Sequence, residues 1–315
     1  MKRQHAAVAC AAAALAGTSL TGCGSSSKNP GGSATTATAH GSTGAFSPES
    51  VPRNAKLAAE VPAAIKSSGT LTVGSDTTYP PYEFIGANGT TPQGIDVDIA
   101  KGLARTLGLK LEYETANFDS ILPAIGTKYD LGISAFTITK ARYAAVDFVS
   151  YFNAGKQWGI QRGNPTHFNP DDVCGTKVGV VTGSTDAQAV QQMSARCVRQ
   201  GKKGVAIVSL PQQTDIATRL VDGALNATLA GSTNVQYAGK QTHGRIVTIG
   251  PISQPSPDGI AVKRGDTAWA RVVAGALNAM IQDGDFRRIL ARWGVQQGAV
   301  SRAVVNPQHN IAASS

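Results

Sequence analysis

The chain has 315 residues, enough for one large domain or two of medium size. Hydrophobic residues make up 42% and charged residues 16% of the sequence, which is typical of globular proteins and excludes disordered and fibrous classes. The 29 basic and 20 acidic side chains leave a net charge of +9, but no basic stretch is denser than Lys202-Lys203 or Arg287-Arg288. A nucleic-acid site needs a basic stripe with stacking aromatic residues. The excess therefore indicates a solvated basic surface, and no nucleic-acid partner is expected.

The N-terminus has the pattern of an export signal. Positive residues at 2 and 3 precede an apolar stretch over 6–20, which is shorter than the roughly 20 residues of a membrane-spanning helix. The stretch ends in Leu20-Thr21-Gly22-Cys23, which resembles the lipobox of bacterial lipoproteins, in which the cysteine is lipidated and becomes the new N-terminus. We expect residues 1–22 to be a signal peptide and Cys23 to anchor the protein in the membrane. An ordinary signal peptide with an incidental cysteine is the alternative.

The regions that flank the folded part have little hydrophobic periodicity. Residues 24–50 are rich in Gly, Ser and Thr, so 23–50 is expected to be a flexible tether, followed by a short helix over 51–67. Residues 297–315 are expected to form a loose tail. No other segment reaches 18 apolar residues, so the sequence predicts that the rest of the chain lies outside the membrane.

Two cysteines remain once Cys10 leaves with the signal and Cys23 carries lipid. Cys174 and Cys197 form an even pair in an oxidising compartment, which predicts a disulfide. Closing a loop of this size stabilises a protein by roughly 3 kcal/mol in the chain-entropy model. The histidines show no ligand spacing to these cysteines, so no metal site and no cofactor are predicted.

From about residue 68, short β-branched or alternating runs alternate with helical patterns. The apolar spacing from 267 to 283 predicts a helix that ends at Asp283-Gly284. This alternation predicts an α/β architecture with mostly parallel sheets in two lobes, with the ligand in the crevice beyond the strand ends. The expected strands are 71–73, 109–113, 131–133, 178–180, 205–210, 227–229, 246–249 and 260–262.

The most specific segment is Gly94-Ile95-Asp96-Val97-Asp98-Ile99, followed by a helical apolar face that ends at Leu107. It resembles the signature of the family 3 extracellular solute-binding proteins, the polar amino acid receptors of ABC importers. Three further segments resemble family segments in the same order: 71–84, 134–142 and 283–294. The resemblance covers about 55 to 296.

The resemblance implies a two-lobe clamp of the type II periplasmic-binding-protein-like class, with two hinge crossovers. Lobe 1 would comprise 68–153 plus 253–296, and lobe 2 would comprise 154–252. The cysteine pair would then lie within lobe 2.

The resemblance also implies a set of ligand-binding residues. Arg142 would hold the ligand's carboxylate, because a guanidinium presents a fixed fork of donors that a carboxylate meets with both oxygens. The alternatives are ordinary ones: a solvated charge for Arg142, a turn-forming role for Asp76 and core packing for Phe118. Ser134 and Thr137 could be ordinary strand-end residues, and the segment from Thr182 to Thr185 could serve only in helix capping. The other implied ligand residues are Asp76, Tyr79, Phe118, Ser134, Ala135, Thr137, Thr182 and Thr185.

One position departs from the family pattern. Where the family usually has an aspartate that pairs with the ligand's α-ammonium group, this sequence has Gly231. A desolvated ammonium without a partner costs several kcal/mol. Either Asp76 or Asp186 supplies the charge, or the ligand lacks a free α-ammonium.

These features predict a lipid-anchored, monomeric binding protein on the extracytoplasmic face of the cell membrane. It would deliver an amino acid or a related small carboxylate to ABC permease subunits. The sequence has no phosphate-binding loop, so the energy source must be on another chain. The alternatives are a secreted dehydratase-like enzyme, with Glu83 and Asp186 as candidate acids, and a sensor that acts through a membrane partner.

Overall fold

The computed structural model describes residues 46–307; the expected signal peptide, Cys23 and most of the tether lie outside the described residues. The strands are β1 (Thr70–Ser75), β2 (Thr78–Tyr79), β3 (Glu83–Ile85), β4 (Pro92–Gln93), β5 (Lys110–Thr115), β6 (Leu131–Gly132), β7 (Val146–Gln161), β8 (Lys177–Val181), β9 (Ala206–Leu210), β10 (Ala227–Gly231) and β11 (Ile246–Lys263). The helices are α1 (Ala55–Ala59), α2 (Ala63–Ser68), α3 (Ile95–Leu107), α4 (Phe118–Ile121), α5 (Thr185–Arg199), α6 (Gln213–Val221), α7 (Ser232–Gln241), α8 (Thr267–Gln282) and α9 (Asp285–Trp293).

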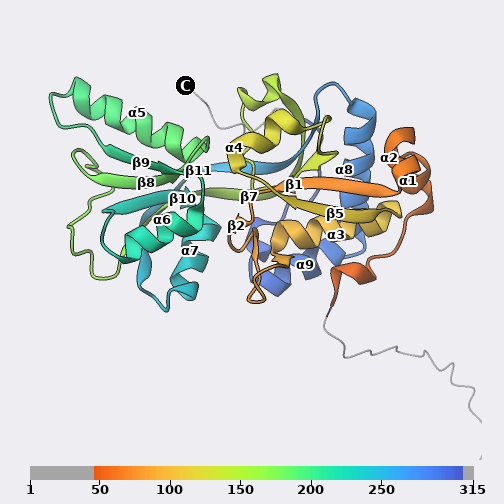
Figure 1. Ribbon diagram of the computed structural model, residues 1–315, viewed down its shortest axis with the longest axis horizontal. Coiled ribbons are helices and arrows are strands. Elements are labelled where there is room, and N and C mark those ends of the chain that lie inside the picture. The colour runs from red at the N-terminus through yellow and green to blue at the C-terminus, as the bar shows by residue number, and fades with distance from the viewer. Residues whose placement is uncertain (1–45, 308–315) are drawn as a thin grey trace, which may run out of the picture. The chain divides into compact units, whose positions relative to one another are not determined.

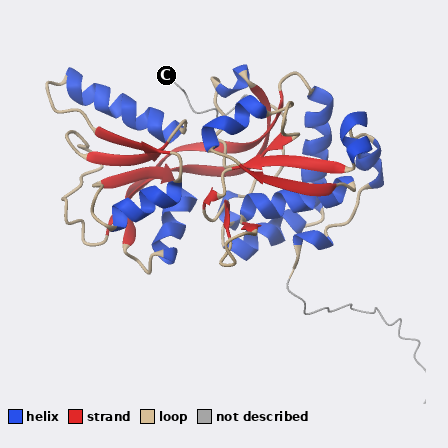
Figure 2. Cartoon of the chain, viewed as in Figure 1, coloured by secondary structure: helices blue, strands red, loops and turns tan. Residues whose placement is uncertain are grey.

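A large sheet with the order β5-β1-β6-β11-β7-β10-β8-β9 runs through this part of the chain, with helices on both of its faces (Figures 1 and 2). We call the half with β5, β1 and β6 lobe 1, and the half with β10, β8 and β9 lobe 2. The strands within each half are parallel. The expected two-lobed α/β fold is confirmed.

The long strands β7 and β11 run antiparallel to each other through both lobes. Their pairing shifts register between Ile249 and Ser253 and again between Ser253 and Ser256. These irregular stretches lie where the chain passes from one lobe to the other, as expected for two crossovers.

Each lobe has its own apolar core. In lobe 1, α3 and α8 pack together, with Leu103 and Trp269 among the buried residues. In lobe 2, α5 covers one face of the sheet, and α6 and α7 cover the other (Figure 1). Because the two cores are separate, the lobes can move relative to one another without breaking either core.

The signature segment forms α3, and its first position requires glycine. Gly94 has φ 137°, and a Cβ there would lie 2.1 Å from the Tyr82 carbonyl oxygen. The helix ends at Gly108 in the left-handed conformation. This geometry places Asp96 in the first turn, next to the loop between β2 and β3.

The expectation of a loose tail is wrong for residues up to 307. The segment over 299–307 lies against the lobe 1 part of β7: Ser150 donates its amide hydrogen to the Val304 carbonyl, and Val149 and Val305 form a β-bridge. In lobe 2 the same edge of β7 is covered by β10. The tail therefore satisfies backbone groups that an open edge would leave unpaired. Residues 308–315 lie outside the described residues.

The N-terminal boundary also differs from the expectation. Residues 46–50 of the expected tether belong to the fold, because Phe46 packs on the lobe 1 core and Pro48 is buried. The single helix expected over 51–67 is two short helices, α1 and α2. Pro62 caps the second helix and cannot continue the first, because proline has no amide hydrogen.

The predicted disulfide between Cys174 and Cys197 is confirmed, with Cα atoms 5.5 Å apart. It joins the segment before β8 to the last turn of α5. Among residues 46–307, no helix is long and apolar enough to cross a membrane.

Candidate ligand-binding site

A cleft between the two lobes has an open volume of about 760 Å³, its mouth included. Lobe 1 contributes the loop after β1, the segment after β6 and part of β11. Lobe 2 contributes the start of α5 and the end of β10. Eight of the nine residues implied by the family resemblance line this cleft: Asp76, Tyr79, Phe118, Ser134, Ala135, Thr137, Arg142 and Thr185.

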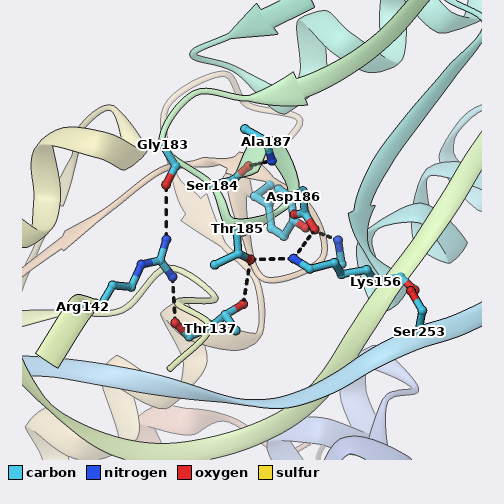
Figure 3. A network of polar contacts seen from close by, with 11 residues as sticks. Thr137, Arg142, Lys156, Gly183, Ser184, Thr185, Asp186, Ala187 and Ser253 are labelled. Carbon is cyan, nitrogen blue, oxygen red and sulfur yellow. Dashed lines mark hydrogen bonds and ion pairs between the residues drawn. The ribbon is translucent and has the colours of Figure 1, made fainter. Parts of the chain in front are cut away.

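Arg142 lies at one end of the cleft, and its guanidinium is held on both sides (Figure 3). One nitrogen donates to the Thr137 carbonyl at 2.8 Å, and the other donates to the Gly183 carbonyl of lobe 2 at 3.4 Å. The rings of Phe118 and Phe136 lie 5.3 and 5.6 Å from the guanidinium carbon. A guanidinium has five donor hydrogens, so donors remain for an anion. Desolvation lowers the pKa of Arg142 to about 10, and the group stays charged at neutral pH.

A second polar network lies at the start of α5 (Figure 3). The Lys156 ammonium forms an ion pair with Asp186 at 2.8 Å and donates to the Thr185 hydroxyl at 2.7 Å. The side chains of Lys156 and Asp186 are only 9% and 14% exposed. Thr185 in turn donates to the Thr137 hydroxyl of lobe 1 at 3.5 Å. The charges of Lys156 and Asp186 thus neutralise each other inside the cleft.

Thr182, the ninth implied residue, does not line the cleft. Its hydroxyl pairs with Ser209 of β9 at 2.8 Å. Ser184 is the N-cap of α5, and its hydroxyl accepts the Ala187 amide hydrogen. Ser184 and not Thr182 faces the cleft.

Ser134 and Ala135 are supported by a buried layer of acids. The Ser134 hydroxyl accepts the Asp76 amide hydrogen at 3.0 Å and donates to Glu83 at 2.8 Å. The Ala135 amide hydrogen goes to Asp96 of the signature helix at 2.9 Å. Burial and the neighbouring Asp96 raise the pKa of Glu83 well above its usual range, which favours the protonated form of Glu83. These polar groups of Ser134 and Ala135 hold the cleft wall and are not free for a ligand.

Asp76 lies in the cleft and is almost fully buried. Its carboxylate accepts a hydrogen bond from the Thr78 hydroxyl at 2.8 Å. Burial raises its pKa to about 6, and the hydrogen bonds from Thr78 only partly offset this effect. The nearby Asp119 raises the pKa further. A ligand cation would relieve this unfavourable environment.

Hydrogen bonds hold the two lobes together around the cleft. The Gly231 amide donates to the Tyr79 hydroxyl at 2.7 Å, and the Asn234 side chain donates to the Pro80 carbonyl at 2.7 Å. The Gln213 amide donates to the Thr78 hydroxyl at 3.2 Å. The structure is therefore that of a closed clamp.

The cleft also contains residues that the sequence analysis did not identify. Lys156, Gln213, Ser256 and Asp258 all line it. Asp258 comes from β11 and is 3% exposed. Burial raises its pKa well above the usual range of a carboxyl group, while Arg142 and Lys156 lower it. A proline-rich run around Asp258 gives no helical or strand signal that marks it as a site residue.

These features define a two-lobed protein with a cleft between its lobes that is lined by charged and polar side chains. Residues 71–296 match the family model for bacterial extracellular solute-binding proteins, family 3. The chain belongs to this family, and it has the general role of a binding protein for an ABC transporter, outside the cytoplasm.

The curated relatives include the arginine-binding protein ArgT of Corynebacterium glutamicum, which is 31% identical over 83% of this chain and 85% of its own length. The L-cystine-binding protein TcyJ of Escherichia coli is 28% identical over 73% of this chain and 84% of its own. Among solved structures, an ancestral arginine-binding protein bound to arginine is similar, with a TM-score of 0.66 and 32% identity over 72% of this chain and 98% of its own. An ancestral amino acid-binding protein described as a precursor of cyclohexadienyl dehydratase has a TM-score of 0.66 and 29% identity, over 73% of this chain and 97% of its own.

Proposed function

We propose that this protein binds a cationic amino acid, with L-arginine as the first candidate, and delivers it to the permease of an ABC importer. The lobes would be 68–153 with 253–296, and 154–252. A lipid on Cys23 would anchor the protein on the extracytoplasmic face of the cell membrane, where it would act as a monomer.

The balance of charges in the cleft carries this proposal. Lys156 and Asp186 neutralise each other. That leaves Arg142, with free donors, and two buried carboxyl groups, Asp76 and Asp258, for which no ion pair is found in the described part of the chain. A cationic amino acid has one carboxylate and two positive groups, which complements this set. Several relatives named as arginine-binding proteins support the same ligand class.

An enzyme on this fold is disfavoured by the surroundings of its candidate acids. Glu83 is fully buried and hydrogen-bonded to Ser134, and it does not line the cleft. Asp186 is paired with Lys156. Neither acid is available to transfer a proton to a substrate.

The ligand class can be tested with residues 24–315, which contain the whole described structure. Unfolding with the disulfide intact, followed by refolding, removes any ligand that co-purifies. At 100 times its Kd, a true ligand stabilises the protein by about 2.7 kcal/mol, which raises the melting temperature by roughly 5–10 °C. We expect this shift with L-arginine and a much smaller one with L-glutamate. A shift with acidic or neutral amino acids alone would contradict the proposed class.

The role in transport requires a separate experiment in the bacterium. Deleting the gene should abolish uptake of radiolabelled arginine at low concentration, and the Cys23→Ser variant should be released into the soluble fraction. Normal uptake together with a lost transcriptional response to arginine would instead support the sensor.

A further inference from the structure

Strand β11 presents one face to the cleft near its crossover between the lobes. Gln254, Ser256 and Asp258 alternate along the strand, and all three line the cleft, as expected for the two-residue period of a strand. Ser256 and Asp258 are 7% and 3% exposed. The Ser256 hydroxyl has no hydrogen-bond partner among residues 46–307, and no hydrogen bond is found there for the Asp258 carboxyl. Two buried polar groups thus point to a ligand that would satisfy them.

The position of Asp258 matches one end of an amino acid. Its backbone pairs with Thr137 in a β-bridge, and the Thr137 carbonyl holds the Arg142 guanidinium. Electrostatic attraction to Arg142 lowers the pKa of Asp258. The pKa of Asp76 is instead raised by repulsion from Asp119. An α-carboxylate and an α-ammonium are attached to the same carbon atom. The protein donor that binds the carboxylate and the protein acceptor that binds the ammonium must therefore lie side by side. Asp258 satisfies this condition.

Two other positions could have supplied a partner for the α-ammonium group, Asp186 and position 231, and neither is suited to this role. Asp186 is paired with Lys156. At position 231, an added Cβ would lie 2.8 Å from the Tyr79 hydroxyl, so that hydroxyl fills the space of a side chain. Gly231 also lies opposite Lys156 in the pairing of β10 with β7. A ligand ammonium bound near Gly231 would lie close to the Lys156 ammonium, and the two positive charges would repel each other.

We propose that Asp258, supported by the Ser256 hydroxyl, accepts the α-ammonium group of the ligand, and that Gly231 serves to admit the Tyr79 hydroxyl. This assignment rests on the proposed function. The side-chain cation of the ligand then belongs to Asp76. In the family pattern, the aspartate that pairs with the α-ammonium group would lie at the position of Gly231 at the end of β10. In this protein the corresponding acidic group would lie on β11 instead.

Binding should also release a proton. Burial raises the pKa of Asp258 well above its usual range, and an ammonium group beside the carboxyl would lower this pKa again, so binding of the ligand should favour loss of a proton from Asp258. Arg142 and Lys156 oppose the raised pKa, while the other groups that interact with Asp258 are acids or tyrosines. These groups are Asp96, Asp186, Tyr79, Tyr82 and Tyr151.

The test is calorimetry with L-arginine and with 5-guanidinopentanoate, which lacks only the α-amino group. Wild-type protein should bind arginine at least about 30-fold more tightly, because one side of a buried charge pair is missing in the analogue. Asp258→Asn should lose most of this preference and stop releasing a proton in paired buffers at pH 7. The matched control is Asp76→Asn, which should keep the preference for the α-amino group and lose the preference for arginine over citrulline.

The outcomes separate the inference from the proposed function. If wild-type protein binds arginine but Asp258→Asn binds it within threefold and still distinguishes the analogue, the assignment of Asp258 is wrong and the proposed function stands. Equal binding of arginine and the analogue by wild-type protein also overturns the assignment, even if the variants do not fold. If wild-type protein binds no cationic amino acid, the proposed function fails, and the assignment fails with it.

Discussion

The contact between Tyr79 and Gly231 makes closure of the clamp sensitive to a single methyl group. In Gly231→Ala, the new Cβ would lie 2.8 Å from the Tyr79 hydroxyl oxygen, closer than such atoms approach. The hydroxyl cannot simply turn away, because it accepts the Gly231 amide hydrogen and its ring stacks on Tyr82 with centroids 5.8 Å apart. The two residues belong to different lobes, so opening the cleft separates them. The cost therefore falls on the closed state alone.

Overpacking of this kind costs about 1–3 kcal/mol. Because the ligand binds in the closed state, its affinity should fall by the corresponding factor, roughly 5- to 150-fold. Isothermal titration with L-arginine measures this loss. The melting temperature of the ligand-free variant should change little, since neither lobe core is altered.

A second variant isolates the hydroxyl. In Tyr79→Phe the oxygen is absent, and the next atom of the ring lies 3.8 Å from the added Cβ, which is ordinary contact. Gly231→Ala should therefore cost much less in the Tyr79→Phe background than in wild-type protein. An equal loss of affinity in both backgrounds would refute the idea that Gly231 makes room for this hydroxyl.

Three further results are expected. Arg142→Ala should weaken binding of arginine at least about 30-fold, and Arg142→Lys should recover only part of the lost affinity, because lysine lacks the planar fork. Titration calorimetry measures both affinities, and wild-type affinity in either variant would contradict the role of Arg142. Arginine affinity should fall as the pH drops below about 6, since Asp76, with its pKa raised to about 6, must then lose a proton to bind the cation, and Asp76→Asn should abolish that component. Replacing both Cys174 and Cys197 with serine should lower the free energy of unfolding by about 3 kcal/mol without changing arginine affinity, as measured by chemical denaturation and calorimetry; an affinity change would mean that the disulfide also affects closure.

Local patterns predicted the parts of the fold that depend on neighbouring residues. The helix expected over 267–283 is α8, and the signature from Gly94 to Leu107 is α3 with its glycine at the start. The continuity of the long strands was not predicted. The runs expected over 246–249 and 260–262 are two ends of the single strand β11, whose middle is rich in proline and pairs irregularly. Pairing with β7, distant in sequence, holds this middle part in place.

The residues of the candidate site likewise fall into those that sequence motifs predicted and those that depend on contacts between distant parts of the chain. Arg142, Asp76 and Tyr79 belong to recognisable segments, and the departure at Gly231 was visible in the sequence. Its physical consequence was not, because it depends on the Tyr79 hydroxyl, which reaches Gly231 from the other lobe. The position of Asp258 likewise depends on its bridge to Thr137, a contact between residues far apart in the sequence.

Moving the ammonium acceptor to β11 has a consequence for closure. Arg142 and Asp258 come from the lobe 1 side of the cleft, so that side alone would hold both α-groups of the ligand. A ligand drives closure only through contacts that the closed state adds. In this protein many of the contacts across the cleft join protein to protein: Tyr79 to Gly231, Pro80 to Asn234 and Thr78 to Gln213. Such bonds stabilise the closed form without ligand, and the ligand's own contribution to closure falls to its contacts with lobe 2 residues that line the cleft, such as Thr185.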